Sequence, residues 1–408
     1  MKYIVVLGDG MSDRKNSALG GRTCLEAAHT PVLDEIAPLS EVGLCKTVPE
    51  GFKPGSDVAN MSVLGFDPKK YYTGRSPLEA VAMGIKLKDD DVTLRCNFVT
   101  LSQDGPYESK TMLDYSAGDI PTEDAEILII FIKMQIFFKV EKNLKFYAGN
   151  SYRHCLVVSG GVTGHDLTPP HDISDKSVYG RLPKGENGEF YADLMKRSFT
   201  LLNDHPVNLK RVKEGKKPAN SIWLWGEGTK PALEDFSKMR GLKGGIITAV
   251  DLVKGIGMLA GMRILDVDGI TGNYDTDFKG KAEAAADALL NDGLDYVYIH
   301  IDAPDECGHR GDCAHKVYSI EQIDGKVLKT LFKRFEKAGE DFALLVCPDH
   351  STPCDIKTHL SDPIPYLLYT NKKSLSNGAK RYTEDEAAAT GSYLSDGYRL
   401  IEKLISLK

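Results

Sequence analysis

Residues 295–312 read Asp295-Tyr-Val-Tyr-Ile-His-Ile-Asp-Ala-Pro-Asp-Glu-Cys-Gly-His-Arg-Gly-Asp312. The opening residues are rich in β-branched and aromatic side chains, which predicts a buried strand. Pro304 suits the first turn of a helix, where its missing N–H is not needed. Asp305 and His309 then share one face of that turn. Because ligands bind beyond the carboxyl ends of strands in open α/β sheets, this is a candidate metal-binding pair, although an exposed Asp–His pair on a surface turn fits the same pattern.

Length and composition narrow the class of protein. The chain has 408 residues, enough for two domains or one large domain with an insertion. Its net charge of −7 provides no basic field for nucleic acid. The longest apolar run, within residues 127–138, is interrupted by Lys133 and Gln135 and is too short to span a bilayer. The eight cysteines form no C-x-x-C pair, and no signal peptide is visible. We therefore expect a cytoplasmic protein with free thiols and no membrane or nucleic-acid partner.

Two more predicted strands end in carboxylates. Residues 3–7 are apolar and lead into Asp9, and residues 341–347 lead into Asp349 and His350, with His359 in the following loop. Each aspartate alone is explained as a turn residue. Together with Asp305 and His309, they make a set of carboxylates and imidazoles without thiolates, which favours Mn²⁺, Mg²⁺, Co²⁺ or Zn²⁺. The set is too large for one ion and suits two ions that clamp a transferring phosphoryl group.

A serine stands at the start of another predicted helix. Gly55-Ser56-Asp57 is typical of a tight turn, and residues 58–64 of the helix that it opens. Ser56 is explained structurally as a helix N-cap, for which serine is a preferred residue. It also lies in the positive field of the helix N-terminus, where an alkoxide or a phosphate ester is stabilised. Ser56 is therefore a candidate nucleophile.

The order of predicted elements indicates an α/β protein with an inserted domain. From residue 86 the pattern changes to a strand at 91–101, a helix from 121 to about 139, an interrupted strand at 145–158 and a helix at 189–204. We expect an inserted α+β substrate-binding domain at 86–217, and a discontinuous metal-binding domain at 1–85 and 218–408. Residues 210–217 are expected to form a solvated basic linker, and residues 392–407 the last helix.

The order of these motifs resembles a known family. Asp-Gly-Met-Ser-Asp from residue 9, Gly-Ser-Asp-x-Ala-Asn from residue 55, Asp305-x-x-x-His309, Asp349-His350 and Thr358-His359 are similar to the motifs of archaeal cofactor-independent phosphoglycerate mutases, in the alkaline phosphatase superfamily. The resemblance implies an alkaline-phosphatase-like sheet sandwiched by helices, with a smaller domain inserted. It implies two divalent ions, Mn²⁺ first among them. One would be held by Asp9, Ser56, Asp349 and His350, the other by Asp305, His309 and His359.

The resemblance also implies a reaction. Ser56 would take the phosphoryl group from a small phosphorylated metabolite, giving a phosphoserine. The glycerate would then reorient and take the group back on its other hydroxyl, interconverting 2-phosphoglycerate and 3-phosphoglycerate in glycolysis. Basic residues near the insert would bind the substrate, and the candidates are Arg75, Arg95, Asn97, Arg153, His154 and Lys254.

One stretch departs from the family pattern. Where relatives commonly carry Asp-Arg-Arg-Ala-Gly-Arg, this chain has Asp114-Tyr-Ser-Ala-Gly-Asp119 and lacks three guanidinium groups. Asp119 could hold an ammonium group, which motivates an alternative acceptor, a small hydroxyl compound such as homoserine phosphorylated from ATP. A metal-dependent phosphomonoesterase and a binding protein that has lost its activity are further alternatives.

Overall fold

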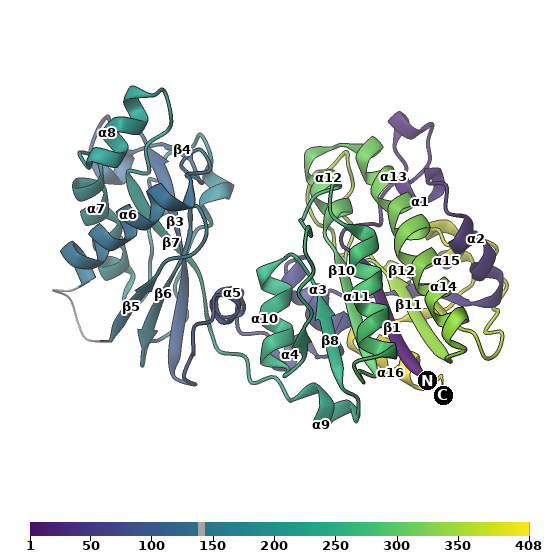
Figure 1. Ribbon diagram of the computed structural model, residues 1–408. Helices are drawn as coiled ribbons and strands as arrows, with labels where there is room; N and C mark the ends of the chain where they lie inside the picture. Colours follow the sequence, from purple (N-terminus) through teal and green to yellow (C-terminus); the bar gives the residue numbers. More distant parts are fainter. Residues whose placement is uncertain (138–142, 408) are drawn as a thin grey trace. The chain divides into compact units, whose positions relative to one another are not determined.

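The computed structural model describes residues 1–137 and 143–407, which form two compact units (Figure 1). Unit 1 comprises Met1–Tyr72 and Ala232–Lys408, and unit 2 comprises Thr73–Pro231. The second unit thus extends beyond the expected insert of 86–217 at both ends. At one end helix α5 (Ser76–Ala82) packs on strands β3 (Asp91–Leu101) and β7 (Ser221–Thr229), and at the other end β7 itself continues the sheet of unit 2.

Unit 1 is built on an eight-stranded sheet in the order β13-β2-β12-β11-β1-β10-β8-β9. Strands β9, β8, β10, β1 and β11 run parallel, and β12 is antiparallel to both β11 and β2. Strand β1 is almost wholly buried between β10 and β11, as expected for an apolar run in a parallel sheet. The strands are β1 (Lys2–Gly8), β2 (Glu41–Cys45), β8 (Gly244–Ile247), β9 (Arg263–Ile264), β10 (Tyr296–Ile301), β11 (Phe342–Cys347), β12 (Ile364–Thr370) and β13 (Tyr393–Leu394).

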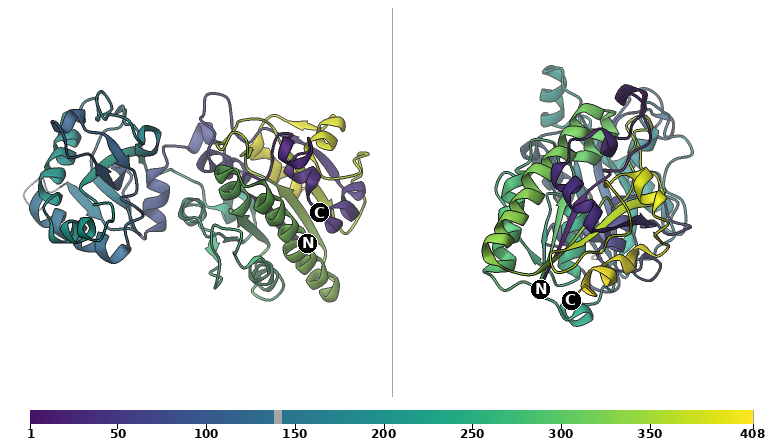
Figure 2. Two further views of the ribbon diagram at one scale, coloured as in Figure 1. Left: turned by 90° about the horizontal axis from the view of Figure 1, so that it is seen from above. Right: turned by 90° about the vertical axis from the view of Figure 1, so that its right-hand side faces the viewer.

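Helices cover this sheet on both faces. The second view in Figure 2 shows the green helices α11 and α14 and the yellow C-terminal helix α16 on opposite sides of the strands. Helices α11 and α14 pack on each other, and α10 packs on α3. The helices of unit 1 are α1 (Cys24–Ala27), α2 (Pro31–Ile36), α3 (Ser56–Val63), α4 (Pro68–Tyr71), α9 (Phe236–Arg240), α10 (Asp251–Leu259), α11 (Phe278–Leu290), α12 (Ala303–Arg310), α13 (Cys313–Gln322), α14 (Lys329–Ala338), α15 (Glu384–Ala389) and α16 (Leu400–Ile405).

Unit 2 is an antiparallel sheet with helices of its own. Its long central strand β3 pairs with β6 on one side and β7 on the other, β4 pairs with the end of β3, and β5 pairs with β6. Helix α7 packs on β7, and α6 packs on α7 and α8. The remaining elements are β4 (Met112–Asp114), β5 (Leu144–Tyr147), β6 (Arg153–Ser159), α6 (Thr122–Ile132), α7 (Gly188–Leu202) and α8 (Pro206–Lys213).

Some expected boundaries are wrong. The basic residues 210–213 form the last turn of α8, which begins because His205 caps it and Pro206 occupies its first position. The C-terminal helix begins at Leu400 rather than 392, since Tyr393–Leu394 pairs with β2 instead. Helix α6 ends at Ile132 and continues as a π-helical turn, Lys133–Phe137. The rest of that expected helix, residues 138 and 139, lies outside the described residues.

The expected fold class, an α/β sheet sandwiched by helices with a smaller α+β domain inserted, is confirmed. No helix in the described part of the chain combines the length and the apolar composition needed to cross a bilayer.

Candidate active site

Three neighbouring parallel strands bring the predicted acidic residues together. Strand β1 pairs with both β10 and β11, so their carboxyl ends meet at one edge of the sheet. Asp9 follows β1, Asp305 lies in the helix that follows β10, and Asp349 follows β11. The apolar strands therefore position three carboxylates, all at least nine-tenths buried, at the edge where α/β proteins bind ligands.

Ser56 is the first residue of α3, so the helix begins two residues before the expected residue 58, and the N-cap is the extended Gly55 rather than Ser56. Its hydroxyl lies 3.2 Å from Nε2 of His350. The backbone N–H groups of the first turn of an α-helix have no partners within the helix, so they favour negative charge at this position. The structure thus places the candidate nucleophile beside a candidate metal ligand.

Asp349 is held from three directions. Its Oδ1 accepts hydrogen bonds from the backbone N–H of Gly10 (3.1 Å) and of His350 (2.8 Å). Its Oδ2 accepts from the Asn60 side chain at 2.8 Å, and the Asn60 Nδ2 also donates to the Ser56 carbonyl at 2.9 Å. The carboxylate is therefore fixed in orientation relative to the start of α3.

Asp9 contacts a histidine of the neighbouring strand β10. Nε2 of the fully buried His300 lies 2.8 Å from Asp9 Oδ2, and its Nδ1 lies 3.2 Å from the Thr248 hydroxyl. Burial, with Lys281 nearby, lowers the pKa of His300 to about 3, so this imidazole is neutral at pH 7. Asp9 Oδ1 is buried and has no hydrogen-bond partner among the described residues, and it lies 3.5 Å from His350 Nε2.

Asp305, His309 and His359 form the second group. Nε2 of His309 lies 2.8 Å from Nε2 of His359 and 3.2 Å from Asp305 Oδ2. Nε2 of His359 lies 3.5 Å from Asp305 Oδ1. Nδ1 of His309 lies 3.1 Å from the Lys357 carbonyl, to which a protonated Nδ1 donates, so Nε2 is left as the ligand atom.

These residues fit divalent metal ions. Ligand atoms of Asp305, His309 and His359 lie within 4.8 Å of one another, as do those of Asp9, Asp305 and His350. Burial, and then the neighbouring carboxylates of Asp349 and Asp305, raise the pKa of Asp9 well above its ordinary value. Crowded buried carboxylates, one with an unpartnered oxygen, are costly without a cation. The donor set of oxygen and nitrogen atoms suits Mg²⁺, Mn²⁺ or Zn²⁺.

Most of the predicted substrate residues lie on one face of the sheet in unit 2. Side chains alternate along β3, and Asn97 is in register with Arg153 of β6. Arg95 and Asn97 therefore share a face with Arg153. The guanidinium of Arg95 stacks on the Trp225 ring, 4.0 Å from its centroid, and the Trp225 indole N–H donates to Asn97 Oδ1 at 3.0 Å.

Arg75, the N-cap residue of α5, adds a further cation to this face. Arg75 Nε donates to Glu79 Oε1 at 2.9 Å, and Arg95 Nε contacts Glu79 Oε2 at 2.7 Å. Burial favours the neutral acid, but Arg95 and then Arg75 hold the pKa of Glu79 below its ordinary value. Burial, with Arg75 and Arg153 nearby, lowers the pKa of Arg95 to about 10, so it remains a cation at pH 7. Two guanidinium groups thus pair with the Glu79 carboxylate, and the charge of Arg153 nearby lowers the pKa of Glu79 further.

The other predicted substrate residues lie elsewhere. His154 faces the opposite side of β6, where its ring packs against Phe98 at 4.8 Å, and it is buried. Its Nδ1 accepts from the Gly149 N–H at 3.2 Å. Lys254 belongs to unit 1, where its helix α10 packs on α3.

The stretch that departs from the family pattern forms a turn. Ser116 N–H and Oγ both donate to Asp114 Oδ1, at 2.7 and 2.8 Å. Ala117 and Asp119 have positive φ angles of 52° and 48°. Arg211, which is buried, donates to the Ala117 carbonyl at 2.9 Å. An arginine from α8 therefore contacts this turn through its backbone.

Sequence reasoning missed two residues of the site, Asn60 and His300. A signal existed for Asn60, which lies one helical turn after Ser56 and so shares its face of α3. His300 lies inside a strand whose other residues are aliphatic or aromatic, and only the pairing of β10 with β1 brings it to Asp9.

The fold and the site define an α/β protein in which carboxylates and imidazoles gather around a serine at a helix N-terminus. The model of the 2,3-bisphosphoglycerate-independent phosphoglycerate mutase family matches residues 37–208. A protein of that name from Methanosarcina acetivorans is 48% identical over 394 residues, 96% of each chain. A probable mutase from Geobacter sulfurreducens is 46% identical over 405 residues, 99% of this chain and 100% of that protein. The chain belongs to the family of 2,3-bisphosphoglycerate-independent phosphoglycerate mutases.

Solved structures agree with this assignment. A protein from Pyrococcus horikoshii is similar with a TM-score of 0.81 at 27% identity, covering 100% of this chain and 97% of that one. The cofactor-independent phosphoglycerate mutase of Thermoplasma acidophilum is similar with a TM-score of 0.64 at 26% identity, covering 100% of both chains. The suspected family is therefore confirmed over the full length.

Proposed function

We propose that the protein interconverts 2-phosphoglycerate and 3-phosphoglycerate through a phosphoserine at residue 56. The observation that carries this proposal is the position of the Ser56 hydroxyl at the start of α3, 3.2 Å from His350 and beside buried carboxylates. The positive field of the helix N-terminus stabilises both the alkoxide and the phosphate ester of a serine in this position.

Two divalent ions complete the proposed site, with Mn²⁺ the first candidate. Asp9, Ser56, Asp349 and His350 are proposed to hold one ion, and Asp305, His309 and His359 the other. Asp305 lies within reach of both groups of ligand atoms, which is consistent with two neighbouring ions. When bound, such ions supply positive charge that favours the serine alkoxide and offsets the charge of the phosphoryl oxygens.

The reaction proceeds in two transfers. Ser56 loses its hydroxyl proton, its Oγ attacks the phosphorus of phosphoglycerate, and the bond from phosphorus to the glycerate oxygen breaks, leaving a glycerate hydroxyl that takes up the proton. The glycerate turns, its other hydroxyl loses its proton and attacks the phosphoserine, and the Ser56 oxygen is released and protonated. The positive field at the N-terminus of α3 stabilises the phosphoserine between the two steps.

The substrate's negative charge is proposed to be met by basic residues. Arg75, Arg95 and Arg153 supply three cations against Glu79, and Asn97 lies on the same face of unit 2. Guanidinium groups bind carboxylate and phosphate in a bidentate manner. Lys254 of unit 1 is a further candidate. His154 is enclosed in the core of unit 2, so its substrate contact has no support from its surroundings.

The arginines of unit 2 also help to distinguish the mutase from the alternative activities. Although three guanidinium groups are missing at residues 114–119, Arg75, Arg95 and Arg153 supply three cations in the same unit, which supports a doubly anionic substrate. Together with relatives that match the full length, this favours the mutase over a homoserine phosphotransferase or a phosphomonoesterase.

A paired assay tests the proposal. Mn²⁺-loaded protein is incubated with 3-phosphoglycerate and the formation of 2-phosphoglycerate is followed, and in parallel the protein receives ATP and homoserine. We expect turnover in the first reaction alone, without release of inorganic phosphate. Turnover only with ATP and homoserine would identify a kinase, and phosphate release without 2-phosphoglycerate would identify a phosphatase.

A further inference from the structure

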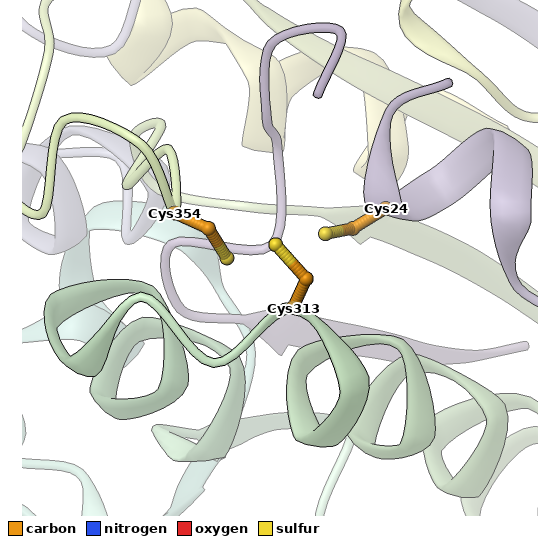
Figure 3. A group of neighbouring side chains, drawn as sticks. All are labelled: Cys24, Cys313 and Cys354. Atoms are coloured by element: carbon orange, nitrogen blue, oxygen red, sulfur yellow. The ribbon is translucent and has the colours of Figure 1, made fainter. Parts of the chain in front are cut away.

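Three cysteines from distant parts of the sequence meet in unit 1, outside the candidate active site. Cys24 is the first residue of α1, Cys313 is the first residue of α13, and Cys354 lies in the loop after β11. Their Sγ atoms all lie within 4.8 Å of one another. Figure 3 shows the three side chains directed toward one point from three separate segments. No disulfide joins cysteines in the described part of the chain, so all three are thiols.

A buried carboxylate lies beside the sulfur atoms. Asp13 Oδ2 accepts from the Cys24 thiol at 3.2 Å and from the Cys354 backbone N–H at 3.4 Å. The same oxygen contacts Nζ of Lys316 at 2.9 Å, and the Lys316 side chain is fully buried. Asp13 Oδ2 therefore contacts two of the three cysteines, the thiol of Cys24 and the backbone of Cys354, and the charge of Asp13 is matched by a fixed ammonium group.

We propose that Cys24, Cys313 and Cys354 bind a zinc ion, with the Asp13 carboxylate as the fourth ligand. Zinc in structural sites is four-coordinate and tetrahedral, with Zn–S distances of about 2.3 Å, which places sulfur atoms about 3.8 Å apart. Three sulfurs within 4.8 Å of one another need only a small inward movement to reach that geometry.

The charges around the cluster suit a divalent thiophilic ion. Each thiol that binds the ion releases its proton to solvent. Three thiolates and one carboxylate carry four negative charges, against which the ion supplies two positive charges and Lys316 one. The Asn16 amide also donates to Cys313 Sγ at 3.4 Å.

The proposed site differs in its donor atoms from the candidate active site. Thiolates select zinc and other soft cations, whereas the carboxylates and imidazoles around Ser56 also suit the harder ions Mn²⁺ and Mg²⁺. The two sites share no ligand. The inference is independent of the proposed mutase activity, since none of its four ligands is among the proposed active-site ligands.

The cluster joins the segments that carry the active-site ligands. Asp13 follows Asp9 in the loop after β1, Cys313 follows His309 after α12, and Cys354 follows His350 after β11. Lys316 reinforces the junction by donating to the carbonyls of Ser12 (3.1 Å) and Thr352 (2.8 Å). A zinc ion at this point would fix the three loops to one another, which is a structural role.

Cobalt substitution tests the site. Metal-free, reduced protein is titrated with Co²⁺, and thiolate-to-cobalt charge-transfer absorption is recorded in the near ultraviolet. The candidate active site has no sulfur ligand, so cobalt bound there contributes none of this absorption. We expect the band in the wild type and its loss in Cys313→Ala, where the substituted side chain is only partly buried. Cys45→Ala, which removes a buried thiol of the same unit outside the cluster, is expected to keep the band.

Elemental analysis and intact-mass spectrometry provide two further measurements. Protein purified with reductant is expected to contain one zinc ion per chain that both Cys313→Ala and Cys354→Ala lose. No charge-transfer band in folded wild type, or a band that persists in both variants, would overturn the proposal. An intact mass lower by two hydrogens, restored by reduction and absent in Cys313→Ala, would identify a disulfide instead of a metal site and would also overturn it.

Discussion

At the scale of single residues, the side chain of Asn60 connects the proposed nucleophile to a proposed metal ligand. Its Nδ2 donates both to the Ser56 carbonyl and to Asp349 Oδ2, and its Oδ1 accepts from the Tyr298 hydroxyl at 2.7 Å. A residue that orients a ligand without binding the ion itself is a positioning residue. Asn60 thus fixes a proposed metal ligand relative to the proposed nucleophile.

Asn60→Ala is expected to lower kcat by about 10–100-fold, because Asp349 loses the donor that orients it. Tyr298→Phe removes only the hydroxyl that supports Asn60 and is expected to have a smaller effect in the same direction. Steady-state kinetics with 3-phosphoglycerate across a Mn²⁺ titration measures both variants. Full activity of Asn60→Ala at low Mn²⁺ would contradict this role.

His359→Ala is expected to lose one of the two proposed ions, since its Nε2 lies 2.8 Å from Nε2 of His309 and completes the second group of ligands. Elemental analysis after removal of free metal gives the metal content per chain. His29→Ala, an exposed histidine of the same unit, serves as the control and is expected to keep both ions. Two retained ions in His359→Ala would remove this residue from the ligand set.

At the scale of elements, the alternation of strands β3 and β6 separates two groups of residues in unit 2. Arg95, Asn97 and Arg153 lie on the face covered by α5, whereas His154 lies on the other face, against the core. The same pairing of strands therefore builds a cationic face and a hydrophobic one. Each face has its own testable consequence.

Arg95→Lys is expected to raise the KM for 3-phosphoglycerate roughly tenfold or more, with a smaller effect on kcat. A lysine cannot both pair with Glu79 and stack flat on Trp225, so its charge is no longer held in a fixed position on this face. Arg197→Lys, which alters an exposed ion pair with Asp193, is the matched control and is expected to leave KM unchanged. An unchanged KM in Arg95→Lys would argue against substrate binding at this face.

The buried imidazole of His154 is expected to make the free energy of unfolding depend on pH. Burial lowers the pKa of His154 to about 3, below the ordinary value of 6.5 that the unfolded chain shows. The unfolded state therefore binds more protons between these values, so stability present above pH 6.5 is lost as the pH falls, by up to about 1.4 kcal/mol per pH unit. In urea unfolding at pH 7 and pH 5, the wild type is expected to lose more stability than His154→Gln. Equal losses would show that this imidazole is protonated in the folded protein.

At the scale of the whole molecule, the sequence predicts the central sheet and most of the proposed site. The apolar runs of β1, β10 and β11 are unambiguous, and Asp9, Asp305 and Asp349 follow from where those runs end. The order of motifs predicts the family, which the relatives confirm. The assignment of ligands to individual ions and the substrate contacts remain proposals.

What the sequence does not predict depends on contacts between distant segments. His300 reads as one more strand residue until β10 pairs with β1. The cysteines at 24, 313 and 354 have no informative spacing, because the loops that carry them meet only in the folded chain. The boundary of unit 2 near residue 73 is likewise set by the packing of α5, since a short helix carries no sign in its sequence of which sheet it will cover.

The central claim is that the phosphoryl group passes through Ser56, and locating that group tests it most directly. Mn²⁺-loaded protein is mixed with 3-phosphoglycerate, quenched in acid within a turnover and digested, and the phosphorylated peptide is sequenced by mass spectrometry. We expect phosphate on Ser56 in the wild type, and in Ser56→Ala no phosphopeptide and a rate lower by at least about 10³-fold. Formation of 2-phosphoglycerate with Ser56 unmodified, or substantial activity in folded Ser56→Ala, would contradict the phosphoserine route.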